Sequence, residues 1–174
     1  MDIKKVGQIS SKKGDKGSST DYSSRSFLKS NILFEVLGTM DELSSNLGLA
    51  YHHTKYEYLL TIQKTLQTIN SLIATDPNSE QYKRLKQIQI DSVVSMESLM
   101  QEILDRYPLE PRFALPGSEK SLNGAYMDIC RTIARRAERR LTDLIIEQER
   151  NDLGIVQSYV NRLSDFLFVL SWNL

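Results

Sequence analysis

The chain of 174 residues carries 22 Lys and Arg against 22 Asp and Glu, so its formal net charge is zero. This balance excludes a global positive field that would draw the protein onto nucleic acid or an anionic membrane, and any anion site must come from a local concentration of charge. The apolar runs are too short to span a bilayer, there is no signal-peptide core, and the single Cys130 cannot form an internal disulfide. These features predict one cytoplasmic domain over residues 1–174.

Residues 1–30 are polar and show no sustained hydrophobic period, which predicts an irregular segment. Within it, the stretch SSKKGDKGSST at 10–20 contains two glycines, three lysines and five Ser/Thr hydroxyls. Such a composition neither sustains a helix nor fills a core. Two interpretations stay open at this point: a disordered polar leader, or a loop that wraps an anion such as a phosphate.

From residue 32 onward, apolar residues recur every three or four positions, which is the helical period. We predict five helices at 32–53, 56–74, 80–106, 121–149 and 155–174. The breaks are TDPNSE at 75–80, with Ser79 as an N-cap, the proline-rich 106–120, and 151–154. No strand alternation separates the helices. The predicted fold class is therefore all-α: a five-helix bundle at 31–174 that follows an irregular segment at 1–30.

The fourth predicted helix carries an unusual charge run, because CRTIARRAERR at 130–140 holds five arginines and one glutamate. One interpretation is a solvated face with Glu–Arg pairs. However, Arg131, Arg135 and Glu138 form a row at i, i+4 and i+7, directly beside the small-residue stripe that begins at Cys130. Guanidinium groups that border a helix seam need carboxylate or phosphate partners.

Polar residues flank the apolar stripes of two other helices. Asp41 lies beside the first stripe in GTMDELSS, and Asn161 and Asp165 flank the last stripe in NRLSDFLF. Any one of them has an ordinary explanation as a surface acid or a hydrogen-bonded amide. Taken with the arginine run, they predict a site at the bundle surface or at a subunit interface.

Five sequence blocks occur in a fixed order: KKGDKGSS, GTMDELSSNLGLA, FALPG, CRTIARRAERR and NRLSDFLFVL. Together they resemble the ATP:cob(I)alamin adenosyltransferases of the propanediol-utilisation type, from about Ser11 to Leu170. The resemblance implies a homotrimeric five-helix bundle that binds MgATP between subunits and transfers the 5′-deoxyadenosyl group to the cobalt of reduced cobalamin. It also implies a flavoprotein reductase or a cobalamin-dependent enzyme as a protein partner, and no nucleic acid or membrane.

The resemblance assigns roles to matched positions. Arg135 matches an arginine that contacts the nucleotide, and Glu138 matches its acidic partner near the phosphates and Mg²⁺. Asp41 and Arg131 match a pair that joins across the subunit interface and shapes the cobalamin side, and Phe113 matches the phenylalanine beneath the corrin. The implied catalytic set is therefore Arg135, Phe113, Asp41 and Arg131. The implied ATP-binding residues are Ser11, Lys12, Gly14, Asp15, Gly17, Ser19, Lys29, Arg135, Glu138 and Asn161.

The region that faces the corrin departs from the family pattern. Ser118 replaces a glycine in LPGS, Asp128 stands where a histidine is common, and the chain is two residues longer than usual between Phe113 and Arg131. These departures motivate a second hypothesis, a non-catalytic module on the same fold that senses or delivers cobalamin or nucleotide.

Overall fold

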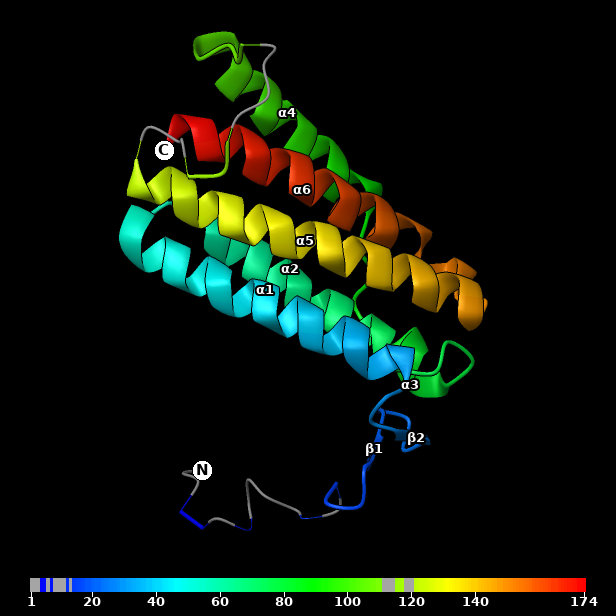
Figure 1. Ribbon diagram of the computed structural model, residues 1–174. Coiled ribbons are helices and arrows are strands. Elements are labelled where there is room, and N and C mark those ends of the chain that lie inside the picture. Colours follow the sequence, from blue (N-terminus) through cyan, green and yellow to red (C-terminus); the bar gives the residue numbers. More distant parts are fainter. Residues whose placement is uncertain (1–3, 6, 8–11, 13, 111–114, 118–120) are drawn as a thin grey trace.

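Five long helices lie side by side in the computed structural model, which describes residues 4–5, 7, 12, 14–110, 115–117 and 121–174 (Figure 1). They are α1 (Ile32–Thr54), α2 (Tyr58–Ile73), α4 (Ile90–Arg106), α5 (Leu122–Glu147) and α6 (Gly154–Asn173). Helix α5 packs against both α1 and α6, and α2 packs against α1. In the described part of the chain, no helix is both long and apolar enough to cross a bilayer. The all-α helical bundle is confirmed.

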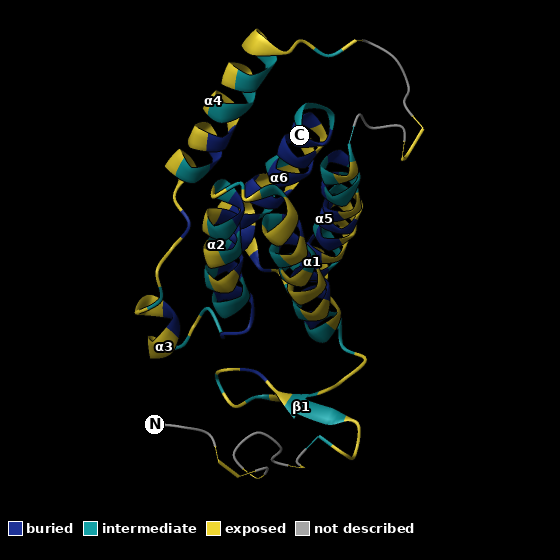
Figure 2. Ribbon diagram, turned by 90° about the vertical axis from the view of Figure 1, so that its left-hand side faces the viewer, coloured by how far each residue is buried: buried dark blue, intermediate teal, exposed yellow. Residues whose placement is uncertain are grey.

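The apolar stripes predicted from the sequence form the core, and the buried faces of the long helices point toward one another (Figure 2). The small residues of α5 make close packing possible, since Cys130, Ala134 and Ala137 are fully buried between α1 and α6. Burial raises the pKa of the Cys130 thiol to about 12, so this cysteine acts as a small apolar residue in the core.

The helix predicted at 80–106 is wrong, because the structure has two helices there: α3 (Glu80–Lys83) and α4 (Ile90–Arg106). Ser79 caps α3 as predicted, with its Oγ accepting a hydrogen bond from Tyr82 N. The apolar residues Ile88 and Val93 are five positions apart, so one continuous helix would turn them about 140° away from each other. Both are buried because the non-helical stretch before α4 resets the helical phase.

The segment predicted to be irregular contains a small antiparallel hairpin of β1 (Ser18–Thr20) and β2 (Ser26–Leu28), in which Ser19 pairs with Phe27. The strands were missed because each has only three residues, too few to show an alternating pattern. The hairpin and α3 lie at the end of the bundle where α1 begins (Figure 1).

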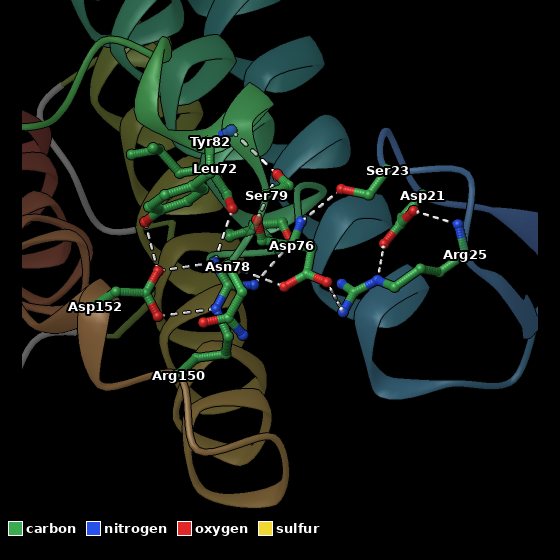
Figure 3. A network of polar contacts seen from close by, with 11 residues as sticks. Asp21, Ser23, Arg25, Leu72, Asp76, Asn78, Ser79, Tyr82, Arg150 and Asp152 are labelled. Atoms are coloured by element: carbon green, nitrogen blue, oxygen red, sulfur yellow. Dashed lines mark hydrogen bonds and ion pairs between the residues drawn. The ribbon is translucent and has the colours of Figure 1, made fainter.

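A buried arginine closes this end of the bundle. Arg150 is 3% exposed, and its guanidinium donates to the carbonyls of Leu72 (2.9 Å) and Ile73 (3.2 Å) at the end of α2 (Figure 3). It also donates to both carboxylate oxygens of Asp152 at 2.9 Å, and Tyr82 Oη donates to the same carboxylate. All of these donors are satisfied, as a buried cation requires.

The charges of this cluster reinforce one another. Burial alone would lower the pKa of Arg150, but the hydrogen bonds and the negative charge of Asp152 outweigh burial and raise it. Burial would likewise raise the pKa of Asp152, yet hydrogen bonds from Arg150 and Tyr82 and the nearby positive charge hold it below its ordinary value. Burial, together with the bond to Asp152, raises the pKa of Tyr82 to about 12.

Candidate functional site

The structure brings two of the predicted site residues together at the seam between α5 and α6. Asn161 Nδ2 donates to Glu138 Oε1 at 2.6 Å. Thr142 Oγ1 donates to the backbone carbonyl of Glu138 at 3.0 Å, and Gln157 Nε2 donates to Thr142 Oγ1 at 3.0 Å. The Glu138 carboxylate is thereby held in place by an amide of the neighbouring helix, with its second oxygen left to accept from a ligand.

An open hollow lies on α5 beside this seam. Its lining residues come from two successive turns of the arginine-rich helix: Arg135, Arg136, Glu138, Arg139, Arg140, Thr142 and Asp143. Some of the arginines are neutralised within the chain. Arg136 pairs with Glu42 of α1, and Arg140 pairs with Asp143 at 3.6 Å.

Two arginines of the hollow remain open to a ligand. Arg135 and Arg139 are exposed, and among the described residues neither has a carboxylate partner. Arg139 Nη1 donates to the Arg135 carbonyl at 3.1 Å. Two guanidinium groups without counter-charges, beside a fixed carboxylate, make a site suited to a multiply charged anion such as a polyphosphate.

The pairing of Asp41 with Arg131 is predicted between subunits, and in the described part of a single chain the two side chains form no ion pair with each other. Arg131 Nε instead donates to Asp128 Oδ1 at 2.6 Å, and the two side chains are only 24% and 14% exposed. Asp41 is exposed on α1, and no ion pair is found for it in the described part of the molecule. Asp128 was not foreseen as this partner, although an acid three residues before an arginine on a helix is a recognisable signal.

The glycine-rich segment forms a tight loop near Lys29. Gly17 N donates to the Gly14 carbonyl at 3.2 Å, and Lys29 N donates to the Gly17 carbonyl at 2.9 Å. A Cβ atom at Gly14 would lie 3.0 Å from Lys29 Nζ, so any side chain there would displace the ammonium group. Gly17 has φ +80°, a conformation in which a side chain is strained. Gly17 therefore allows a backbone path that a larger residue would strain, whereas a side chain at Gly14 would only shift the end of the Lys29 side chain.

The other matched positions of this segment surround the same loop. Lys12 precedes it with an exposed side chain, and Asp15 N donates to the Lys12 carbonyl at 3.3 Å. Ser19 lies in β1, directly after the loop. Ser11 lies outside the described residues.

The loop and the α5–α6 seam lie apart in a single chain. The hairpin that carries the loop stands beyond the first turn of α1 (Figure 1). Between described residues, no hydrogen bond or ion pair joins residues 12–29 to Arg135, Glu138 or Asn161. Phe113 and Ser118 lie outside the described residues, but Gly117 has φ +84°, a conformation that is typical of a tight turn.

Comparison with known proteins adds independent findings. Residues 9–174 match the family model described as cobalamin adenosyltransferase. The chain is 35% identical to the corrinoid adenosyltransferase of Bos taurus, over 96% of this chain and 71% of that protein. It is 31% identical to the corrinoid adenosyltransferase of Citrobacter freundii, over 94% of this chain and 93% of that protein.

Solved structures agree with the sequence relatives. A phenylalanine-to-alanine variant of the PduO-type ATP:corrinoid adenosyltransferase from Lactobacillus reuteri, complexed with cobalamin and ATP, superposes with a TM-score of 0.85 at 28% identity, covering 94% of this chain and 91% of that one. An arginine-to-lysine variant of the same enzyme, complexed with ATP, gives a TM-score of 0.84 at 28% identity, covering 95% and 92% of the two chains.

Proposed function

Because the chain belongs to the cobalamin adenosyltransferase family, we propose that it transfers the 5′-deoxyadenosyl group of ATP to the cobalt of a reduced corrinoid. The cobalt–C5′ bond forms with the electron pair of Co(I), and the bond from C5′ to the triphosphate oxygen breaks. Triphosphate leaves with that bonding pair. Since Co(I) is itself the nucleophile, the residues of this chain position the reactants and stabilise the departing charge.

The observation that carries this proposal is the pair of open arginines beside the fixed Glu138. The other arginines of the run pair with Asp128, Glu42 and Asp143, whereas Arg135 and Arg139 keep their donors for a ligand. Triphosphate gains negative charge at its bridging oxygen as it departs. A guanidinium that faces the phosphates therefore stabilises the transition state more than it stabilises bound ATP.

The glycine-rich loop supplies the second set of phosphate contacts in this proposal. Gly14 and Gly17 let the backbone approach the phosphates closely, and Lys12 and Lys29 add two ammonium groups. Among the described residues, no group of three His, Cys, Asp or Glu side chains could hold a metal ion by itself. Mg²⁺ would enter this site with the ATP phosphates, and the Glu138 oxygen that does not accept from Asn161 would be a candidate ligand for it.

We further propose that the site is completed between copies of the chain in a homotrimer. Among the described residues of one chain, no hydrogen bond or ion pair connects the loop to the α5–α6 seam, although both match ATP-binding segments of the family. Asp41 also lacks an in-chain partner among the described residues. A neighbouring subunit that brings its loop to this seam would unite the two halves.

One assay tests the proposed activity directly. The protein is incubated with MgATP and chemically reduced cobalamin, and the absorbance change that accompanies formation of the cobalt–carbon bond is followed. We expect saturable turnover in both substrates. Saturable ATP binding without this absorbance change would support the non-catalytic sensor or delivery module instead.

Asp41→Asn is expected to weaken use of cobalamin more than binding of ATP, with the helices still folded. The substitution removes the charge of the exposed carboxylate but keeps the shape of the side chain. The loss of its ion pair with a neighbouring subunit should weaken that interface by about 1 kcal/mol. Calorimetry with each ligand and sedimentation measure the two effects. The control is Glu80→Gln, which removes one negative charge from α3. A wild-type protein that sediments as a monomer would contradict the placement of Asp41 at a subunit interface.

Phe113→Ala is expected to affect two assays differently, because Phe113 matches the family's phenylalanine beneath the corrin. If the ring displaces the lower axial base of cobalt, the variant should nearly lose turnover from cob(II)alamin with a mild reductant. It should retain much of its turnover when cobalamin is supplied already reduced to Co(I). Equal losses in both assays, with a lower melting temperature, would mean that Phe113 only anchors its loop.

A further inference from the structure

The turn of the β1–β2 hairpin is attached to the end of α2 by three contacts. Tyr22 N donates to the Ala74 carbonyl at 2.8 Å, and Asp76 N donates to Ser23 Oγ at 2.8 Å. Arg25 Nη1 and Asp76 Oδ2 form an ion pair at 3.1 Å (Figure 3). These contacts join segments that lie about fifty residues apart in sequence, so tertiary structure alone creates this attachment.

On the hairpin side, Arg25 is held in position by Asp21. The Asp21 carboxylate is fully buried and accepts from Arg25 N at 2.8 Å and from Arg25 Nε at 2.7 Å. The Arg25 guanidinium also lies 5.5 Å from the centre of the Phe27 ring in β2. One edge of Arg25 is thus fixed to its own turn, and the other is directed at Asp76.

On the bundle side, the segment that bears Asp76 is itself fixed. Arg150 holds the carbonyls of Leu72 and Ile73 immediately before it. The Asp76 carboxylate accepts from Asn78 N at 3.0 Å, and Ser79 Oγ donates to the Asp76 carbonyl at 2.7 Å. The Asp76 carboxylate therefore presents a stationary anchor to the hairpin.

The hairpin leads directly into the phosphate loop. At its open end Ser18 pairs with Leu28, and Lys29 N donates to the Gly17 carbonyl at 2.9 Å. The ammonium of Lys29 lies against Gly14. Any tilt of the hairpin turn away from α2 would be transmitted through these few residues to Gly14, Gly17 and Lys29.

We propose that Arg25 and Asp76 are positioning residues for the ATP phosphates: their ion pair docks the hairpin on the bundle and so presents the phosphate loop and Lys29 to the nucleotide. This inference rests on the proposed function. Neither residue touches the phosphates. They raise the fraction of molecules whose loop is correctly placed before ATP arrives, and apparent affinity scales with that fraction.

The test uses Asp76→Asn and Arg25→Gln, alone and combined, in the full chain. The asparagine keeps an oxygen for Asn78 N and removes only the charge. We expect each variant to raise the KM for ATP about three- to tenfold, since a partly exposed ion pair contributes modestly. For Asp76→Asn, the kcat at saturating ATP, the KM for cobalamin and the melting temperature should stay near their wild-type values. Arg25→Gln also removes the counter-charge of the buried Asp21 carboxylate, so its melting temperature should fall. The KM for ATP of the double variant should be no higher than that of Arg25→Gln alone, because the Arg25–Asp76 pair is already lost in that single variant.

The matched control is Glu80→Gln, which removes the exposed Glu80–Lys83 pair (2.6 Å) on the neighbouring α3 and should leave all of these values unchanged. An unchanged KM for ATP in both Asp76→Asn and Arg25→Gln of an active enzyme would overturn the inference. So would a parallel loss of ATP use, cobalamin use and melting temperature in Asp76→Asn, since that pattern marks a general structural role. Lack of turnover in the wild-type protein would instead count against the proposed function.

Discussion

Arg135→Ala is expected to lower kcat/KM for ATP by about 30- to 1000-fold, equivalent to roughly 2–4 kcal/mol of transition-state stabilisation. Arg135 is exposed beside Glu138 and has no carboxylate partner among the described residues, so its guanidinium is available to the phosphates. Arg135→Lys should recover little of this loss, because a point charge cannot reproduce the two-pronged donor geometry of a guanidinium. Steady-state kinetics with reduced cobalamin at saturation measure both variants.

Arg140→Ala is the matched control for this experiment. Arg140 lies on the same helix and loses the same charge, but its guanidinium already pairs with Asp143 at 3.6 Å. We expect its kcat/KM to fall only slightly. Near-normal kinetics in Arg135→Ala would remove Arg135 from the site. Equal losses in the two variants would show that Arg135 acts only through the general positive potential of the helix.

Arg150→Met is expected to destabilise the fold by about 3–5 kcal/mol, which lowers the melting temperature by roughly 10 °C in a domain of this size. The change leaves the carbonyls of Leu72 and Ile73 without their donor and Asp152 without its counter-charge. Methionine fills much of the same volume, so the loss reports on the polar contacts and not on a cavity. Urea unfolding followed by circular dichroism measures the free energy of unfolding.

The control is Arg162→Met, an arginine on α6 that pairs with Glu97 and Asp165 at 2.7 Å each but is 34% exposed. Exposed pairs of this kind contribute about 0–1 kcal/mol, so this variant should be nearly as stable as the wild type. A small effect of Arg150→Met, comparable with that of Arg162→Met, would contradict a structural role for the buried cluster.

The pH dependence gives an independent check of the same cluster. The pKa of Asp152 is held below its ordinary value in the folded protein. Its contribution to the free energy of unfolding is therefore fully present above the pKa of the same carboxyl in the unfolded chain, about 3.9. That contribution is lost as the pH falls through the folded pKa. The difference in unfolding free energy between wild type and Arg150→Met should therefore be constant from about pH 5 to 8 and shrink below about pH 4. A difference that is independent of pH would exclude Asp152 as the partner that matters.

Local signals in the sequence were sufficient for most of the secondary structure. The hydrophobic period placed α1, α2, α5 and α6 to within a few residues, because an amphipathic helix must bury one stripe. The N-cap of α3 was equally recognisable, since Ser79 was predicted for this role and its Oγ accepts from Tyr82 N. The hairpin and the interruption before α4 could not be predicted from local signals. Three-residue strands are too short to show a period, and the interruption changes only one spacing, the five residues from Ile88 to Val93.

The sequence by itself also determined which residue types border the seam of α5, because angular position on one helix follows from spacing alone. Only the tertiary structure decided how those charges are used. Arg136 pairs with Glu42, which lies 94 residues away in sequence, and Glu138 accepts a hydrogen bond from Asn161 on another helix. Arg135 has no carboxylate partner among the described residues. Arg150, one more arginine in a charged stretch, becomes a buried anchor of α2. The physical reason is that the periodicity of one helix fixes which face is buried but not which neighbouring helix covers it. The strength and partner of a charge depend on distances and solvent exposure that exist only once the helices have packed.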